Sequence, residues 1–309
     1  MTTQRPDQSK APSWLPFAPW LFVGLWSAGY GVAKLCLEYT TPLNLLAMRF
    51  VLTASILALP LVFYKVSFPS WRALGPLCLV SLCIHVVHFG LVYGGLSFGA
   101  SAGVLALFAA SQPLLVEVSV SLFYRRFPRV ITMTGLGLGM AGAAYVIIMR
   151  HEFSAGALLG ALMGFLAVVS FSIGTACDRY RTKNESPLAG YFVQYLFAAI
   201  VSLPLAYAVE GLQITPHINL LAGVGYLVLG NAIVGIFLLL TMVQFNSLSR
   251  VTSVMFLVPG LGALIAWLVV GEAMPFETWP GIIMAGLGVI MVLYAETIFP
   301  SKNNGKQDV

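Results

Sequence analysis

Ten apolar stretches, each long enough to cross a lipid bilayer as a helix, make up most of this chain. A hydrocarbon core of about 30 Å requires about 20 apolar residues per helix. Only 9% of the residues are charged, against about 25% in soluble domains. The sequence therefore predicts an all-α polytopic membrane protein with spans at residues 16–36, 42–64, 73–94, 100–124, 130–149, 156–177, 187–209, 218–243, 250–270 and 279–298.

The connections between these spans are too short to hold a soluble domain. We predict a disordered tail at 1–15, a five-helix repeat at 16–149, a second five-helix repeat at 156–298, and a tail at 299–309. The first tail lacks the basic, apolar and cleavage regions of a signal peptide, so we expect the first span to be retained. We also expect the chain to work as a monomer.

Basic residues are distributed unevenly between the two sides that ten spans define. Thirteen Lys and Arg residues fall on the side of the termini, Lys34 and Arg150 fall on the other, and Arg49 lies within the second span. Basic residues accumulate in cytoplasmic loops. This bias predicts that both termini are cytoplasmic and that the chain lies in the plasma membrane, which in a bacterium is the inner membrane.

A shift of 146 residues superimposes the two halves of the sequence. It pairs Pro113 with Pro259, each in the middle of an apolar stretch, and a proline there removes a helical hydrogen bond. Each predicted half has five spans, an odd number, so the halves must have opposite orientations, as in many transporters with inverted repeats. We predict that both prolines are hinges. The same shift pairs Gly135 with Gly281, Gly142 with Gly288, Leu122 with Leu268 and Val146 with Val292.

Four spans resemble those of the drug/metabolite transporter superfamily, in its EamA-type ten-helix branch. The first span, GLWSAGYGVAKLCLEYTTP, is similar to that family's opening pattern with its terminal lysine, here Lys34. The second begins PLNLLAMRF and has the family's arginine–aromatic pair, Arg49-Phe50. The fourth, GASAGVLALFAASQPLL, and the ninth, which ends at Gly271-Glu272, are similar too. The first half departs from the pattern because Arg125-Arg126 stands where Gly-Glu is common.

The resemblance covers residues 16–298 and implies export of small metabolites. It implies a central cavity enclosed by the first, third, fourth, sixth, eighth and ninth helices, with the fifth and tenth outside. Within the superfamily the chain resembles exporters of aromatic or neutral amino acids, which makes amino acids the expected substrates. Export of drugs or other metabolites is the alternative. A nucleotide-sugar carrier fits less well, because such a cavity needs several Lys or Arg residues.

Two polar positions are paired by the 146-residue shift in the third and eighth spans. His85 corresponds to Asn231, and His88 lies one helical turn after His85. Ionisable residues inside a membrane are functional candidates, so we predict that these three contact substrate, together with Gln112 beside Pro113. The alternative is that each only bonds a neighbouring helix.

Charged residues near the outer end of the first two spans suggest a gate. Lys34 and Glu38 are four residues apart and could form an ion pair, which Arg49 could join. If Arg49 instead reaches the cavity, it would suit a carboxylate on the substrate. Glu117, one turn after Pro113, is a further candidate for an ion network, and its alternative is pairing with an arginine near the following turn.

Aromatic residues in several spans could form the wall of a cavity for an amphipathic solute. Packing within the bundle and contact with lipid are the alternatives for each of them. The candidates are Trp26, Tyr30, Tyr93, Phe108, Phe171 and Trp267.

No enzyme motif, nucleotide-binding loop or metal-ligand cluster occurs in the sequence. We therefore expect no catalytic residue, no cofactor and no bound metal. The net charge of +5 is explained by topology and not by nucleic acid, so the expected partners are a small-molecule substrate and the lipid bilayer. A membrane enzyme acting on lipids is the alternative from another class, although the acidic residues are too scattered for its catalytic cluster.

Overall fold

The computed structural model describes residues 12–63, 66–123, 125, 127, 130–150, 154–178, 186–244, 258–272 and 275–298. These residues form helices and no named strand; an isolated antiparallel bridge joins Thr40 to Ile214. The first half contains η2 (Leu15–Phe17), α1 (Ala18–Cys36), α2 (Pro42–Phe63), α3 (Trp71–Ser81), η3 (Leu82–Val87), α4 (His88–Ser97), α5 (Ala102–Ala110), α6 (Gln112–Phe123) and α7 (Val130–Met149).

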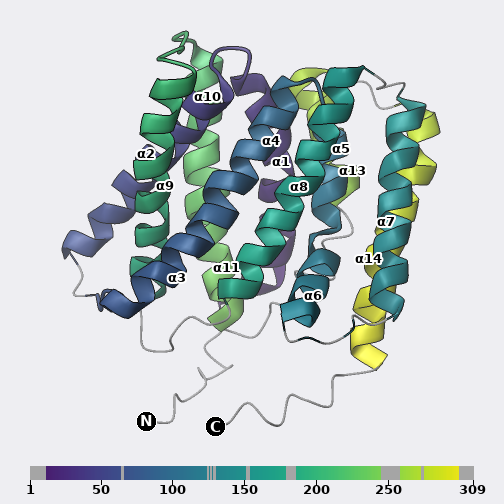
Figure 1. Ribbon diagram of the computed structural model, residues 1–309, viewed down its shortest axis with the longest axis horizontal. Coiled ribbons are helices and arrows are strands. Elements are labelled where there is room, and N and C mark those ends of the chain that lie inside the picture. The colour runs from purple at the N-terminus through teal and green to yellow at the C-terminus, as the bar shows by residue number, and fades with distance from the viewer. Residues whose placement is uncertain are drawn as a thin grey trace.

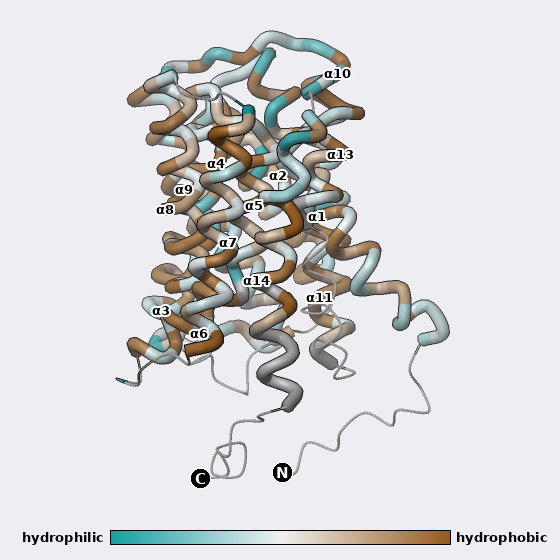
Figure 2. Tube along the Cα trace, turned by 90° about the vertical axis from the view of Figure 1, so that its right-hand side faces the viewer, coloured by the Kyte–Doolittle hydropathy of each residue, from teal (hydrophilic) through white to brown (hydrophobic). Residues whose placement is uncertain are grey.

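The second half repeats this series of elements. It contains α8 (Ala155–Asp178), α9 (Pro187–Val209), α10 (Ile218–Gly225), η4 (Tyr226–Val234), α11 (Gly235–Gln244), α13 (Val258–Val270), η6 (Phe276–Thr278) and α14 (Trp279–Ile298). Polar residues gather toward the two ends of the bundle, and apolar residues dominate between them (Figure 2). The chain is therefore an all-α, multi-pass membrane protein, as predicted.

Six of the described helices are long and apolar enough to cross a membrane. A seventh span results if α5 and α6 count as one, because they are joined by a bend of 49°. Three further predicted spans, 16–36, 250–270 and 279–298, overlap α1, α13 and α14, and residues 250–257 lie outside the described part. The bounds agree closely with those expected from hydropathy, but the count of ten spans stays a prediction.

The bend between α5 and α6 lies at one of the two predicted hinges. The helix is interrupted at Ser111, and Pro113 follows at the start of α6. A proline cannot donate the helical hydrogen bond, which accounts for an interruption at this point. Pro259 is in the first turn of α13, and the residues before that helix lie outside the described part. The structure therefore shows a bend at the first hinge position only.

Helices that the 146-residue shift pairs with each other also pack against each other. The pair α2 and α9 forms one edge of the bundle, and α7 and α14 form the other (Figure 1). Between these edges α13, whose counterpart by the shift is α6, packs against α5 of the same span. The Gly142 backbone touches Gly281, and the Gly135 backbone touches Gly288. Applied to the contact between Gly142 and Gly281, the 146-residue shift gives the contact between Gly288 and Gly135, so the two contacts are equivalent. Equivalent helices are antiparallel, which is the packing that a two-fold axis in the membrane plane would produce.

Two π-helical segments also occur at equivalent positions. The segment η3 interrupts the third span, and η4 interrupts the eighth. The 146-residue shift places η3 within η4. Single-turn π-helical segments are often found at functional sites, and these two segments carry the paired residues His85 and Asn231.

Candidate functional site

A small cavity lies between α1, α2, α4 and η4. The volume open to the centre of a water molecule is about 20 Å³, which is room for little more than one water. The side chains of the bundle thus nearly fill the site in this conformation. Its lining consists of Trp26, Gly29, Tyr30, Arg49, Phe89, Val92, Tyr93 and Asn231.

Arg49 is the polar centre of this cavity. It lies seven residues into α2, about 10 Å along the helix, and only 2% of its surface is exposed. Its Nη1 donates to the Tyr93 hydroxyl at 2.7 Å, and its Nη2 donates to Asn231 Oδ1 at 2.6 Å. The guanidinium carbon lies 3.9 Å from the ring centre of Phe89. Both hydrogen-bonded partners and the ring are neutral.

The positive charge of Arg49 has no carboxylate partner among the residues that line the cavity. None of the eight lining residues is acidic, and the Nε atom is buried without a hydrogen bond. Burying an ion costs several kcal/mol unless an opposite charge accompanies it. Hydrogen bonds and the Phe89 ring offset part of that cost. The cavity therefore has a positive charge that only an added anion would neutralise.

Asn231 connects the Arg49 guanidinium to the first span. Its side-chain amide donates to the Leu25 carbonyl oxygen at 3.1 Å, while its oxygen accepts from Arg49. A Cβ on Gly29 would lie 2.9 Å from the Asn231 amide nitrogen, so this approach requires glycine. Asn231 is therefore held by contacts to two other spans, α1 and α2, which fits its predicted place at the cavity.

The repeat-related counterpart of this pair is an aromatic contact. The shift pairs Arg49 with Tyr195 on α9, and Asn231 with His85 on η3. The rings of His85 and Tyr195 are 4.3 Å apart at a steep angle, and Phe50 lies 5.8 Å from the His85 ring. His85 is 4% exposed, and neither ring nitrogen has a partner. His85 does not line the cavity, because these aromatic rings surround it.

His88 and Phe171 lie beside the cavity without lining it. The Nδ1 atom of His88 is 2.9 Å from the Ala167 carbonyl oxygen, and its Nε2 has no partner. The His88 ring packs against Phe171 at 5.0 Å, and Phe171 packs against the cavity residue Trp26 at 5.9 Å. This contact joins His88 to the neighbouring helix α8, which is the alternative role expected for His88 from the sequence.

Other candidates lie away from the cavity. Phe108 is buried against Phe165, with ring centres 6.1 Å apart, and Trp267 is 52% exposed. Neither forms the cavity wall, because one packs in the core and the other points out of the bundle. Gln112 begins α6 with its side-chain oxygen buried and unpaired. The side chain of Glu117 is outside the described part.

The prediction that Lys34 pairs with Glu38 is wrong, because the partner of Lys34 is Glu272. Lys34 donates to Glu272, which follows α13, while Glu38 is exposed at the end of α1. Arg49 does not join Lys34, since it occupies the central cavity. The reason is tertiary: α13 packs along α1 and brings a carboxylate closer to Lys34 than its own helix does.

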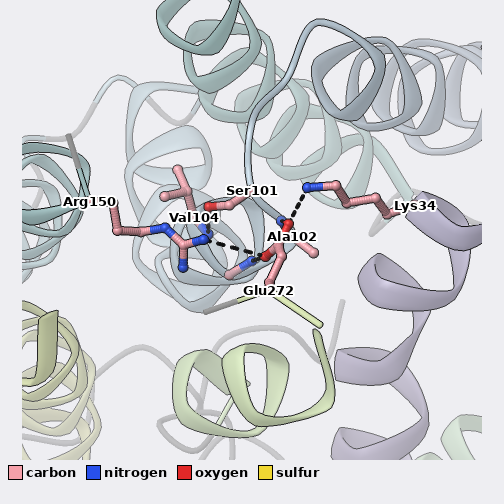
Figure 3. A network of polar contacts seen from close by, with 7 residues as sticks. Lys34, Ser101, Ala102, Val104, Arg150 and Glu272 are labelled. Atoms are coloured by element: carbon pink, nitrogen blue, oxygen red, sulfur yellow. Dashed lines mark hydrogen bonds and ion pairs between the residues drawn. The ribbon is translucent and has the colours of Figure 1, made fainter. Parts of the chain in front are cut away.

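Glu272 joins four segments at one end of the bundle (Figure 3). Its carboxylate accepts from the backbone N–H of Ala102 at 3.0 Å and of Gly103 at 3.4 Å, at the start of α5. Arg150, after α7, lies 3.8 Å from the same group. A carboxylate suits a helix N-terminus, where the helix dipole is positive. Gly271 has φ +65, a conformation that favours glycine at a helix C-terminus, and it directs Glu272 toward α5.

A second carboxylate makes an equivalent connection at the same end. Glu210, directly after α9, accepts from the Thr41 hydroxyl and from the backbone N–H groups of Leu43 and Asn44. Thus Glu210 caps α2, and Glu272 caps α5. In each case a carboxylate that follows a second-half helix holds the N-terminus of a first-half helix. Both carboxylates therefore connect helices of the two halves at one end of the bundle.

Several of these residues were missed by sequence reasoning. Tyr195 could have been found by applying the 146-residue shift to Arg49, and Glu272 by noting an acid directly after a helix-ending glycine. Phe89, Val92 and Gly29 give no such signal, because apolar and small residues are common in every span. In the described residues, no group of three or more His, Cys, Asp or Glu side chains could hold a metal ion.

Comparison with known proteins adds a family to this geometry. Residues 158–294 match the EamA-like transporter family. The chain is 23% identical to the uncharacterized inner membrane transporter YedA of Escherichia coli K12, over 90% of both chains. It is 25% identical to the uncharacterized transporter YvbV of Bacillus subtilis 168, over 87% of this chain and 88% of that protein. Residues 158–294 are thus similar to the EamA-like transporter family, and most of the chain is similar to the two transporters.

A solved crystal structure has the same fold. It superimposes with a TM-score of 0.66 at 18% sequence identity, covering 94% of this chain and 100% of the other. Because that coverage extends well beyond residues 158–294, the fold similarity includes both halves of the bundle.

Proposed function

Since residues 158–294 match the EamA-like transporter family, we propose that the chain is a secondary transporter of the bacterial inner membrane. It exports small metabolites that carry a carboxylate, amino acids being the class expected from sequence, by alternating access. The observation that carries this proposal is Arg49, a buried guanidinium without a carboxylate partner in a central aromatic cavity. A buried charge in a transmembrane bundle is costly, and a substrate anion would offset that cost.

The proposed architecture is two inverted five-helix repeats with both termini in the cytoplasm. Its support is the antiparallel packing of equivalent helices, above all the glycine contacts between α7 and α14. Inverted repeats allow one half to rock against the other around a fixed site near the bilayer midplane. The bend between α5 and α6 supports Pro113 as a flexible point in that motion, and Pro259 is its proposed counterpart.

The described conformation has one end closed, which is one of the two states that alternating access requires. Glu272 and Glu210 cap α5 and α2 at that end, and Tyr39 stacks on His217 with ring centres 4.2 Å apart. We assign this end to the outside, because Lys34 and Arg150 are the two basic residues on the charge-poor side. Opening it requires these contacts to separate.

Reconstitution of the purified full-length chain into proteoliposomes tests the proposal. Labelled amino acids and other small carboxylates would be supplied with and without a proton gradient, and protein-free liposomes provide the background. We expect saturable flux of at least one carboxylate above that background. Absence of flux for every compound under both conditions would contradict the proposed transporter function.

A further inference from the structure

The cavity has a positive charge but no acidic side chain among its lining residues to pair with a second positive charge. Its Arg49 is buried, and the other lining residues are aromatic or apolar apart from Asn231. The Asn231 oxygen already accepts from Arg49, and the Tyr93 hydroxyl does as well. Their remaining acceptor capacity lies next to the guanidinium, where a second cation would be repelled.

The glutamates at the closed end are not available to the cavity. Glu272 and Glu210 cap α5 and α2 at the closed end, and Glu38 and Glu277 are exposed. An amino acid brings an ammonium group as well as a carboxylate into the site. Its ammonium would lie within a few bond lengths of the group bound to Arg49 and would have no anion of its own.

From this charge balance we infer that the cavity prefers organic monoanions without an ammonium group to zwitterionic amino acids. The inference rests on the proposed function and narrows its substrate class to 2-oxo acids and similar apolar or aromatic carboxylates. The carboxylate binds Arg49, whose Nε is free and whose planar guanidinium suits paired hydrogen bonds to a carboxylate. The apolar part of the solute packs against Trp26, Phe89 and Val92. An anion neutralises the site, whereas a zwitterion leaves it with a net positive charge.

Two matched pairs of solutes test this inference on the wild-type chain. Pyruvate and alanine have the same carbon skeleton, as do phenylpyruvate and phenylalanine, and each pair differs at C2 by an oxo or an ammonium group. Uptake of each labelled compound into proteoliposomes would be measured at pH 7. We expect the oxo acid of at least one pair to be transported 10-fold or more faster than its amino acid. Phenethylamine, which has the ring and the amine without the carboxylate, should not compete.

The outcomes separate the inference from the proposed function. If the acids are transported but in neither pair is the oxo acid 10-fold faster than its amino acid, the inference is overturned and the transporter stands. Lack of flux for all four acids overturns the inference, and flux of other labelled metabolites then decides whether the transporter itself stands.

A variant series checks the role of Arg49 in this preference. R49Q should lose the preference for the oxo acid, and R49K should retain part of it, because lysine keeps the charge but lacks the planar fork. Y207F, at an exposed tyrosine of α9, is the control and should keep the preference. An unchanged preference in R49Q would overturn the assignment to Arg49. If R49Q fails to assemble, the wild-type pairs still decide the inference.

Discussion

Arg49 and Asn231 form a charged, hydrogen-bonded pair beside the cavity, whereas their repeat-related counterparts, Tyr195 and His85, form an aromatic contact. The two pairs occupy equivalent places on α2 with η4 and on α9 with η3. The two halves thus share the backbone arrangement at these positions, but their side chains differ in chemistry. A symmetric scaffold carries one ionic group in these two pairs, so a solute would meet different surroundings on the two sides of the pseudo-two-fold axis.

The edge formed by α7 and α14 shows the opposite relation. There both halves use the same residue type, because Gly135, Gly142, Gly281 and Gly288 all meet a facing glycine. Close backbone contact tolerates only the smallest side chains. The two halves therefore have the same residue type where backbones touch, and different residue types at and around the cavity. This difference separates scaffold positions from candidate functional positions.

The largest effect is expected from a substitution at the glycine contacts between α7 and α14. In Gly142→Leu, the new Cβ would lie within 3 Å of the Gly281 carbonyl oxygen and the Ala285 backbone, so α7 and α14 must separate. Overpacking costs about 1–3 kcal/mol or more, and we expect most of the folded protein to be lost. Size-exclusion profiles and membrane abundance would measure this. Gly137→Leu is the matched control, because a Cβ added there would have no atom within 4 Å; similar losses in both variants would contradict this account.

Removing the positive charge at the cavity should reduce transport without reducing the stability of the fold. We expect R49M to reduce transport at least 10-fold, while the unfolding temperature stays the same or rises. Removing a buried charge that has no carboxylate partner among the cavity residues removes its desolvation cost, which offsets the loss of its hydrogen bonds to Tyr93 and Asn231. Y207F, at an exposed tyrosine of α9, should change transport less than threefold. Thermal unfolding and proteoliposome flux measure both quantities, and a strongly destabilised R49M would instead make Arg49 a structural residue.

A smaller effect is expected from a substitution of Glu272 at the closed end. E272Q keeps hydrogen-bonding capacity at the start of α5 but removes the ion pairs with Lys34 and Arg150. A partly exposed ion pair contributes about 1 kcal/mol, or roughly a fivefold change in the open population. The buried thiol of Cys36, at the end of α1, serves as the reporter. Its labelling by a membrane-impermeant maleimide, read by peptide mass spectrometry, should rise about fivefold.

The matched control for that experiment is E277Q, at an exposed glutamate near the same end. It should leave the labelling of Cys36 unchanged. Equal labelling in E272Q and wild type would show that these ion pairs do not hold the end closed.

The smallest effect is expected at the bend between α5 and α6. P113A restores a helical N–H at the break, which favours a straighter helix and disfavours the bent conformation. We expect transport to slow by about twofold to threefold with little change in membrane abundance. Flux normalised to protein amount is the measurement. A parallel loss of flux and abundance would assign Pro113 to folding.

Much of the fold followed from the sequence because bilayer thickness fixes the length of a span locally. The bounds expected at 130–149, 187–209 and 279–298 are those of α7, α9 and α14, and the place of Asn231 at the cavity followed from the 146-residue shift. The partner of Lys34 did not, because four-residue spacing on one helix says nothing about a residue 238 positions away.

The tertiary structure alone decided which polar residues meet. His85 and Asn231 are equivalent in sequence, yet Asn231 lines the cavity and His85 is enclosed by Phe50 and Tyr195. Arg49 looked like part of a gate from its position near the end of a span, and it reaches the centre because its side chain is long and α2 packs beside η4. Hydropathy places a helix in the membrane, whereas the environment of each side chain depends on the helices packed around it.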